Sequence, residues 1–320
     1  MRLATAALAL GIALAHHAAF GQTYPTKPLR MIVPFPPGGT SDVIGRTLGQ
    51  KLSEAWGQTV LIDNRSGVAG SIGASAVAKA PPDGYTLVVG NVGPIAVNPS
   101  IYKAVGYDST RDFTPITVAV TAPQIVVVHP SVPAKNFREF SALVKRHAKT
   151  NYGSSGPGSI SHLSAELYKR MTKTNMLHVP YKGSALITIA VLSGEVDVVF
   201  SDMAVVLPHV QAGKLRALAV TGLKPTPLVP GIPSMAESGV PGFEMTSWWG
   251  VLGPAGLPQP ITAQLNKELG RILHQSDVRK GFATLGVDAT TSTPDEFASL
   301  IRAEVAKYEK LITAIGIEKQ

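Results

Sequence analysis

The 320-residue sequence contains no cysteine. A disulfide framework, a thiolate nucleophile and a zinc site built on sulfur are therefore excluded, and stability must come from packing. There is no HExxH motif, and histidines such as His129, His178 and His209 are scattered without a partner at the spacing of metal ligands. We therefore expect neither a metal site nor a cofactor.

Charged residues are also scarce. They make up 16% of the chain, yet the formal net charge is +8. Binding to a nucleic-acid backbone needs a basic stripe with stacking aromatic residues, and the sequence has none. The densest basic run, Lys145 to Lys149, closes the helix predicted over Phe137 to Lys149, where cations offset the helix dipole and face solvent. We expect no nucleic-acid partner, because a surplus of this kind bears on solubility and on weak attraction of anions.

Long apolar runs are absent after the first residues. The stretch Leu3 to Ala15 follows Arg2 and precedes small residues, an order that is typical of an export signal. It is about half the length that spans a bilayer, and no polar face interrupts it as in an amphipathic helix. We predict a cleaved signal peptide over residues 1–21. The remaining chain is long enough for two domains.

From Leu29 onward, β-branched runs alternate with helical patterns, which is typical of a parallel sheet with crossover helices. In the first predicted helix, Ser41 to Trp56, the apolar residues Ile44, Leu48 and Leu52 recur every four positions. This stripe predicts the face by which the helix packs on the sheet.

The alternation stops at residues 117–130, where two β-rich runs are separated only by Thr-Ala-Pro. We place there a crossing into a second α/β series. The adjacent Trp248 and Trp249 lie in the predicted return crossing, where packing between the lobes is favoured over stacking on a ligand. The predicted boundaries are 22–121 and 249–320 for the first lobe and 122–248 for the second.

The C-terminal part is predicted to be helical. Thr293, Pro294 and Glu296 form a capping box with proline at the first helical position. An apolar stripe follows from Phe297 to Ile312. We expect this helix to close over the first lobe.

The most specific local feature is the segment Pro34 to Asp42, PFPPGGTSD, between the first strand and the first helix. Gly38 and Gly39 allow close backbone approach, and Thr40 and Ser41 are natural N-cap residues. Free N–H groups of the helix start would then lie beside two hydroxyls, which predicts an anion site without a cation. A well-capped turn explains the hydroxyls but explains the double proline and double glycine poorly.

A second loop of glycine and serine, Tyr152 to Leu163, occupies the equivalent position in the second series. It is neither a P-loop, since no lysine follows the glycines, nor a dinucleotide fingerprint, since the glycine spacing is incomplete. Two such helix starts, one from each lobe, would grip one ligand between them.

The residue types of a catalytic triad are present in Ser154, Ser155, His162 and Asp202. The nucleophile-elbow pattern fails because Pro157 occupies its last glycine position. His162 fits a buried or boundary position on a helix face better than a catalytic one. Asp202 ends a strand at the edge where open α/β sheets bind ligands, and it equally fits the N-cap of the next helix.

Several segments, in order along the chain, resemble the tripartite tricarboxylate transporter (Bug-type) family of periplasmic solute-binding receptors. They include Tyr24 to Leu48, the loop Tyr152 to Leu163, and His178 to Asp202, and the similarity extends past Pro258. The resemblance implies an α/β chain with the type II periplasmic-binding-protein fold, in which two lobes are joined by two crossing strands with a ligand cleft between them.

The resemblance also implies a ligand carboxylate held by loop amides and hydroxyls rather than by an arginine. Carried over position by position, the contacts fall in the first lobe on Phe35, Gly39, Thr40, Ser41, Asp42 and Asn91, and in the second on Ser154, Ser155, Gly156, Ser159 and Asp202. Phe35 fits either an aromatic ligand or a structural role beside two prolines.

The expected protein is thus a monomeric, non-enzymatic periplasmic receptor that closes its lobes on a small carboxylate and delivers it to integral-membrane transporter subunits. The ligand is left open between di- or tricarboxylates, acidic amino acids and aromatic carboxylates. Two alternatives stand beside this one. One is a ligand sensor that signals to a partner protein, and the other is a periplasmic serine hydrolase, for which the sequence offers no positioned base.

Overall fold

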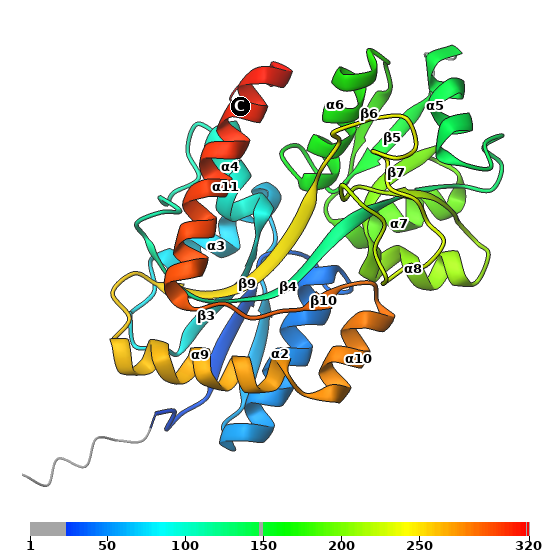
Figure 1. Cartoon of the computed structure of the whole chain (residues 1–320). Helices are drawn as coiled ribbons and strands as arrows, with labels where there is room; N and C mark the ends of the chain where they lie inside the picture. Colours follow the sequence, from blue (N-terminus) through cyan, green and yellow to red (C-terminus); the bar gives the residue numbers. More distant parts are fainter. Residues whose placement is uncertain (1–23, 147–149, 318, 320) are drawn as a thin grey trace, which may run out of the picture.

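A computed structural model describes residues 24–146, 150–317 and 319. The predicted signal peptide and the last residues of the helix predicted over 137–149 lie outside this range. The described chain folds into two α/β lobes joined by two long strands that run side by side (Figure 1). Within these residues, no helix is both long and apolar enough to cross a membrane.

The first lobe is built on a sheet in which β1 pairs in parallel with β2 and β3, while β3 pairs antiparallel with β9. Its elements are β1 (Leu29–Val33), α2 (Thr40–Trp56), β2 (Val60–Asn64), η1 (Val68–Gly70), α3 (Ser71–Ala78), β3 (Thr86–Asn91), η2 (Gly93–Val97), α4 (Asn98–Ile101), α9 (Gln259–Leu273), α10 (Ser276–Thr284), β10 (Asp288–Ala289) and α11 (Pro294–Ile315).

The second lobe places β5 in parallel between β6 and β7, with β7 and β8 each antiparallel to β4. Its elements are α5 (Phe137–Arg146), β5 (Asn151–Ser154), α6 (Ile160–Thr172), β6 (Leu177–Pro180), α7 (Ser184–Ser193), β7 (Val198–Asp202), α8 (Met203–Gln211) and β8 (Arg216–Val220). The sequence pattern predicts helices that begin at Phe137, Ser159 and Ala185, and α5, α6 and α7 each begin within one residue of these positions.

The crossings are β4 (Phe113–Val128) and β9 (Thr246–Pro254), which pair with each other. Thr-Ala-Pro does not divide two strands, as the sequence pattern had indicated, because β4 continues through it. Pro123 is the last β4 residue paired with β9, and from Gln124 onward the partners are β7 and β8. The proline, which lacks an N–H, therefore sits where the strand changes partners. Both predicted lobe boundaries fall within these crossing strands.

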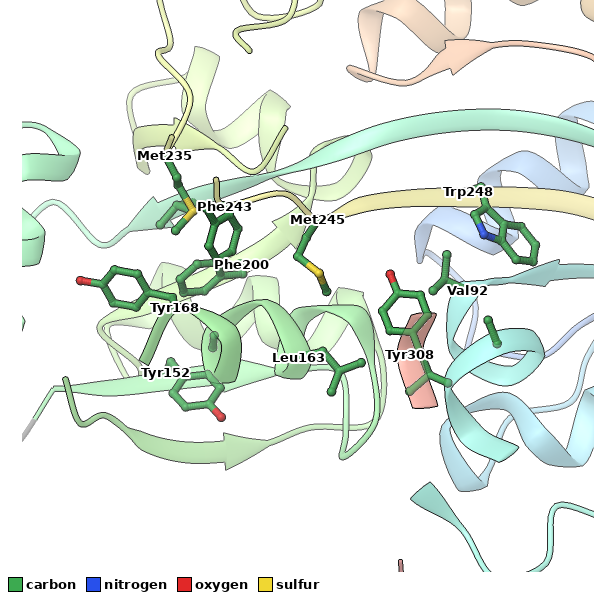
Figure 2. Packing of buried hydrophobic residues seen from close by; sticks show 14 of the residues in the cluster. Val92, Tyr152, Leu163, Tyr168, Phe200, Met235, Phe243, Met245, Trp248 and Tyr308 are labelled. Carbon is green, nitrogen blue, oxygen red and sulfur yellow. The ribbon is translucent and has the colours of Figure 1, made fainter. Parts of the chain in front are cut away.

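Each sheet face has its own hydrophobic cluster, as the alternation of side chains along a strand requires. Val88 belongs to one cluster, whereas Leu87 and Val89 belong to the other. Both clusters include residues of both lobes. Figure 2 shows part of the first cluster, with Phe200 and Phe243 in the second lobe, Trp248 on the crossing strand β9 and Tyr308 in the first lobe.

Helices α2 and α11 pack as predicted. In α2, Ile44, Leu48 and Leu52 are buried on the sheet, and Gly49 allows so close an approach that a Cβ atom there would lie 2.8 Å from Ile62 Cδ1. Helix α11 begins with the complete capping box at Thr293 and packs on β4, η2 and α4 of the first lobe.

Candidate ligand-binding site

A cavity of about 170 Å³ lies between the two lobes. A single water needs only roughly 10–15 Å³ by the same measure, so the space is sufficient for a small organic molecule. The first lobe and β9 contribute Phe35, Pro36, Pro37, Gly39, Thr40, Ser41, Ala69, Asn91, Val92, Gly93, Ser247 and Trp249, and the second lobe contributes Ser155, Ser159, Ile160, Lys182, Gly183, Ser184, Ala185, Leu186 and Asp202.

Four helices begin at this cavity. The N-cap residues of α2, α6, α7 and α8 are Gly39, Ser159, Gly183 and Asp202, and all four line it. The first N–H groups of a helix have no intrahelical acceptor, and the helix dipole places partial positive charge at that end. The cavity is therefore suited to an anion, and its positive potential comes largely from backbone groups.

The first-lobe loop brings its hydroxyls to the cavity in a way the sequence did not predict. Gly39, rather than Thr40 or Ser41, is the N-cap of α2. Thr40 Oγ1 instead donates across the cleft to Asp202 Oδ2 at 3.1 Å. Gly39 allows a close approach of the lobes, because a Cβ atom there would lie 3.0 Å from Ser184 Oγ of the opposite lobe and the serine side chain would have to shift.

Asp42 does not line the cavity. Its carboxylate accepts hydrogen bonds from Gly38 N, Arg46 Nε and Asn64 Nδ2, at 2.9 to 3.0 Å. Burial alone would raise the pKa of Asp42, but these hydrogen bonds, together with the charge of Arg46, lower it. Asp42 therefore holds the loop in place from behind, where an anionic group does not oppose an anionic ligand.

Some serines of the second-lobe loop line the cavity, and another makes hydrogen bonds that support the loop from behind. Ser155 and Ser159 line the cavity, whereas Ser154 and Gly156 lie behind it. Ser154 Oγ accepts from Gly156 N at 3.2 Å and lies 2.6 Å from His178 Nε2. Ser159 Oγ donates to Gly156 O at 2.6 Å, so its single hydrogen is used within the loop. Of the two loop serines at the cavity, Ser155 has the freer hydroxyl, whose oxygen lies 3.1 Å from Ser161 Oγ.

A stacked histidine pair supports this loop. His162 Nδ1 accepts from Gly158 N at 3.2 Å, and the rings of His162 and His178 stack with centroids 4.3 Å apart. Burial lowers the pKa of His162 to about 4, with the neighbouring His178 acting in the same direction. The pair is therefore neutral near pH 7, and His162 is a buried supporting residue, as predicted for its helix face.

Asp202 occupies the N-cap position of α8 but makes no side-chain bond to that helix. Its Oδ2 accepts from Thr40, and its Oδ1 is buried without a hydrogen-bond partner among the described residues. Burial raises the pKa of Asp202 to about 6, although interactions with the side chains of Thr40 and Gln124 oppose the rise. The carboxyl group thus ties the two lobes together, and it is costly to ionise in the absence of a further donor.

Sequence reasoning missed the start of α7 and one wall of the cavity. The signal for α7 was present, because Gly183 and Ser184 repeat the pattern of small residues between a strand and a helix. Trp248 packs edge-on against Phe297, as expected for a structural tryptophan. Trp249, for which packing between the lobes was the favoured prediction and stacking on a ligand the alternative, lines the cavity and donates from Nε1 to Ser41 Oγ at 3.1 Å.

The described residues contain no group of three or more histidine, aspartate or glutamate side chains placed to hold a metal ion. Ser154 and His178 are within hydrogen-bond distance, but Ser154 is fully buried and does not face the cavity. The geometry is that of a binding site, with hydroxyl and N–H groups arranged around an enclosed space.

Two α/β lobes, two crossing strands and an enclosed cavity between them define a solute-binding protein. Residues 44–317 match the family model described as tripartite tricarboxylate transporter family receptor. The chain therefore belongs to this family of receptors, whose members and structural neighbours are binding proteins and not enzymes.

The chain is also similar to individual proteins and solved structures. The chain is 33% identical to protein BugT of Bordetella pertussis over 92% of this chain and 91% of BugT. It is similar to the solved structure of R. palustris Rpa4515 with adipate, at 36% identity and a TM-score of 0.90, covering 93% of this chain and 100% of that one. It is also similar to MatC from Rhodopseudomonas palustris with bound malate, at 31% identity and a TM-score of 0.85, covering 90% and 100%.

Proposed function

We propose that this protein is a periplasmic receptor that captures a small carboxylate between its lobes and delivers it to integral-membrane transporter subunits. The observation that carries the proposal is the convergence of four helix N-termini on one enclosed cavity. Backbone N–H groups and hydroxyls at helix starts bind carboxylates without a paired cation.

The charged groups around the cavity fit this class of ligand. Lys182 is the cationic side chain among the lining residues, and it is exposed at the rim. Asp202 is already engaged by Thr40, so its negative charge is partly offset. The names of two similar structures include adipate and malate, both small dicarboxylates. A dicarboxylate is therefore the first ligand to test.

Closure of the lobes follows from the contacts across the cleft. Thr40 bonds to Asp202, and Tyr102 OH of the first lobe donates to Pro157 O of the second at 3.1 Å. These groups form part of the closed state, so a ligand that binds between the lobes favours closure through its differential affinity for that state. The closed form is the species that a membrane partner would distinguish from the open one.

The test is a binding panel of succinate, malate, adipate, citrate, aspartate, nicotinate and terephthalate, measured by thermal shift and calorimetry on protein that has been unfolded and refolded to remove any retained ligand. An acid present at a hundred times its Kd should stabilise the fold by about 2.7 kcal/mol. The methyl esters serve as matched neutral controls and should give no shift. Equal binding of acid and ester, or no binding of any acid, would contradict the proposal.

The cellular part of the proposal needs separate measurements. We infer that residues 1–21 are removed during export and that the mature receptor is monomeric, with lobes over 22–121, 249–320 and 122–248. N-terminal sequencing of protein from a periplasmic extract tests the processing, and light scattering of that protein tests the oligomeric state. Uptake of the bound acid by cells that lack the gene tests delivery to a transporter rather than to a sensor.

A further inference from the structure

The hydroxyl of Ser41 lies at the cavity wall between two hydrogen-bond donors. Trp249 Nε1 approaches its oxygen at 3.1 Å and Asn91 Nδ2 at 3.4 Å. Ser41 is buried, with 4% of its surface exposed, and it lines the cavity. Whether Trp249 and Asn91 donate to or accept from Ser41 determines where the hydrogen of the Ser41 hydroxyl points.

Neither neighbour can accept that hydrogen. The indole N–H of Trp249 is a donor only. The side-chain amide of Asn91 has both donor and acceptor atoms, but its orientation is fixed, because Asn91 Oδ1 accepts from Gly93 N at 3.1 Å. Its NH₂ group therefore faces Ser41.

A serine oxygen has two lone pairs and one hydrogen. Trp249 and Asn91 use the two lone pairs, and no acceptor among the described residues takes the hydrogen of Ser41. We propose that Trp249 and Asn91 are positioning residues that force the Ser41 hydroxyl to donate into the cavity, so that this point of the site accepts only a hydrogen-bond acceptor of the ligand. The inference rests on the proposed function, since a ligand carboxylate oxygen is the acceptor that the hydroxyl would meet.

The test is a double-mutant cycle on ligand affinity, probed by calorimetry with the panel acid that binds the wild type most tightly. Ser41→Ala removes a hydrogen bond to a charged group and should weaken binding roughly 10- to 100-fold. Trp249→Phe keeps an aromatic wall but frees one lone pair, so the hydroxyl can turn away, and it should weaken binding roughly 3- to 10-fold. In the Ser41→Ala background, Trp249→Phe should change affinity less than about twofold, because there is no hydroxyl left to orient.

Trp248→Phe is the matched control. Trp248 is the neighbouring tryptophan, it is also buried, and its Nε1 has no hydrogen-bond partner among the described residues. This variant should leave the affinity unchanged. If Trp249→Phe does not fold, Asn91→Ala serves in the same cycle, because Asn91 is only partly buried and provides the second donor.

Each outcome separates the two proposals. If Trp249→Phe and Asn91→Ala weaken binding by the same factor with and without the Ser41 hydroxyl, they only shape the wall, and the inference is wrong while the receptor function stands. If both leave wild-type affinity unchanged, the inference is also wrong. If no panel acid binds the wild type, the proposed function and this inference fail together.

Discussion

Asp202 is a residue whose charge opposes folding when no ligand is bound. Its pKa is about 6 in the folded protein and 3.8 in the reference state, so the ionised form is penalised above about pH 6 and the penalty is absent below about pH 3.8. Asp202→Asn should therefore raise the free energy of unfolding at pH 8, by up to about 3 kcal/mol, and the gain should disappear as the pH falls toward 4.

Urea unfolding of ligand-free wild type and variant at pH 8 and pH 4 measures this difference. Asp295→Asn, which replaces an exposed carboxylate in the first turn of α11, is the control and should show no comparable gain at pH 8. A gain from Asp202→Asn that is equal at both pH values would mean that ionisation of Asp202 is not its cause.

The sequence predicted which loops line the cavity, but it did not predict which residues of each loop face it. Phe35, Gly39, Thr40, Ser41, Asn91, Ser155, Ser159 and Asp202 were predicted and line the cavity, and ligand contact by each remains a prediction. Asp42, Ser154 and Gly156 are neighbours of lining residues, and they point into hydrogen bonds behind the loops. Neighbouring residues at the end of a strand or the start of a helix point in different directions, and sequence pattern alone does not fix which of them faces the cavity.

At the scale of elements, the alternation of strands and helices was sufficient to predict the two α/β series, because each element carries its own periodicity and its own end signals. The pairing of β4 with different partners on either side of Pro123 was not predictable, since it depends on contacts with β7, β8 and β9 far along the chain. The N-terminus of α7 was missed as part of the site for a similar reason, because Gly183 lies next to Pro36 only where the two lobes meet.

The start of α6 depends on neutral histidines, which predicts a pH effect on this element. The pKa of His162 is about 4, below the reference of 6.5, and burial lowers that of His178 as well. A lowered histidine pKa stabilises the fold above about pH 6.5 and loses that contribution as the pH falls toward 4. The charges facing the pair are Glu166, which favours protonation, and Lys169, which opposes it.

His162→Asn keeps an acceptor for Gly158 N and cannot be protonated in this range. We expect wild type to lose up to about 3 kcal/mol of unfolding free energy more than this variant does between pH 6.5 and pH 4. His274→Asn, at an exposed position at the end of α9, should keep the wild-type slope. Asp202 acts in the opposite direction but is common to all three proteins. Parallel slopes for wild type and His162→Asn would show that His162 does not carry the effect.

At the scale of the whole molecule, the two lobes are held against each other by polar contacts such as that from Thr40 to Asp202 and by the packing of α11 on α6, in addition to the two crossing strands. Strands β4 and β9 pair with each other along the crossing, up to Pro123 on β4, so the lobes are joined by a paired two-stranded connection. The bond from Tyr102 to Pro157 joins the lobes, whereas the bond from Tyr107 OH to Pro94 O, at 2.5 Å, lies within the first lobe. Variants of Tyr102 therefore test the contact between the lobes, whereas variants of Tyr107 test the stability of the first lobe.

Tyr102→Phe should weaken ligand binding because it removes a bond made only in the closed state. A net hydrogen bond of about 0.5–1.5 kcal/mol corresponds to a roughly 2- to 12-fold higher Kd, with little change in the unfolding free energy of the ligand-free protein. Tyr107→Phe should do the reverse, with a loss of about 1 kcal/mol in stability and an unchanged Kd. Calorimetry and urea unfolding of both variants test this, and small-angle scattering should find the ligand-free Tyr102→Phe protein at least as extended as wild type. If Tyr102→Phe lowers stability and leaves the Kd unchanged, the bond to Pro157 is not part of ligand-linked closure.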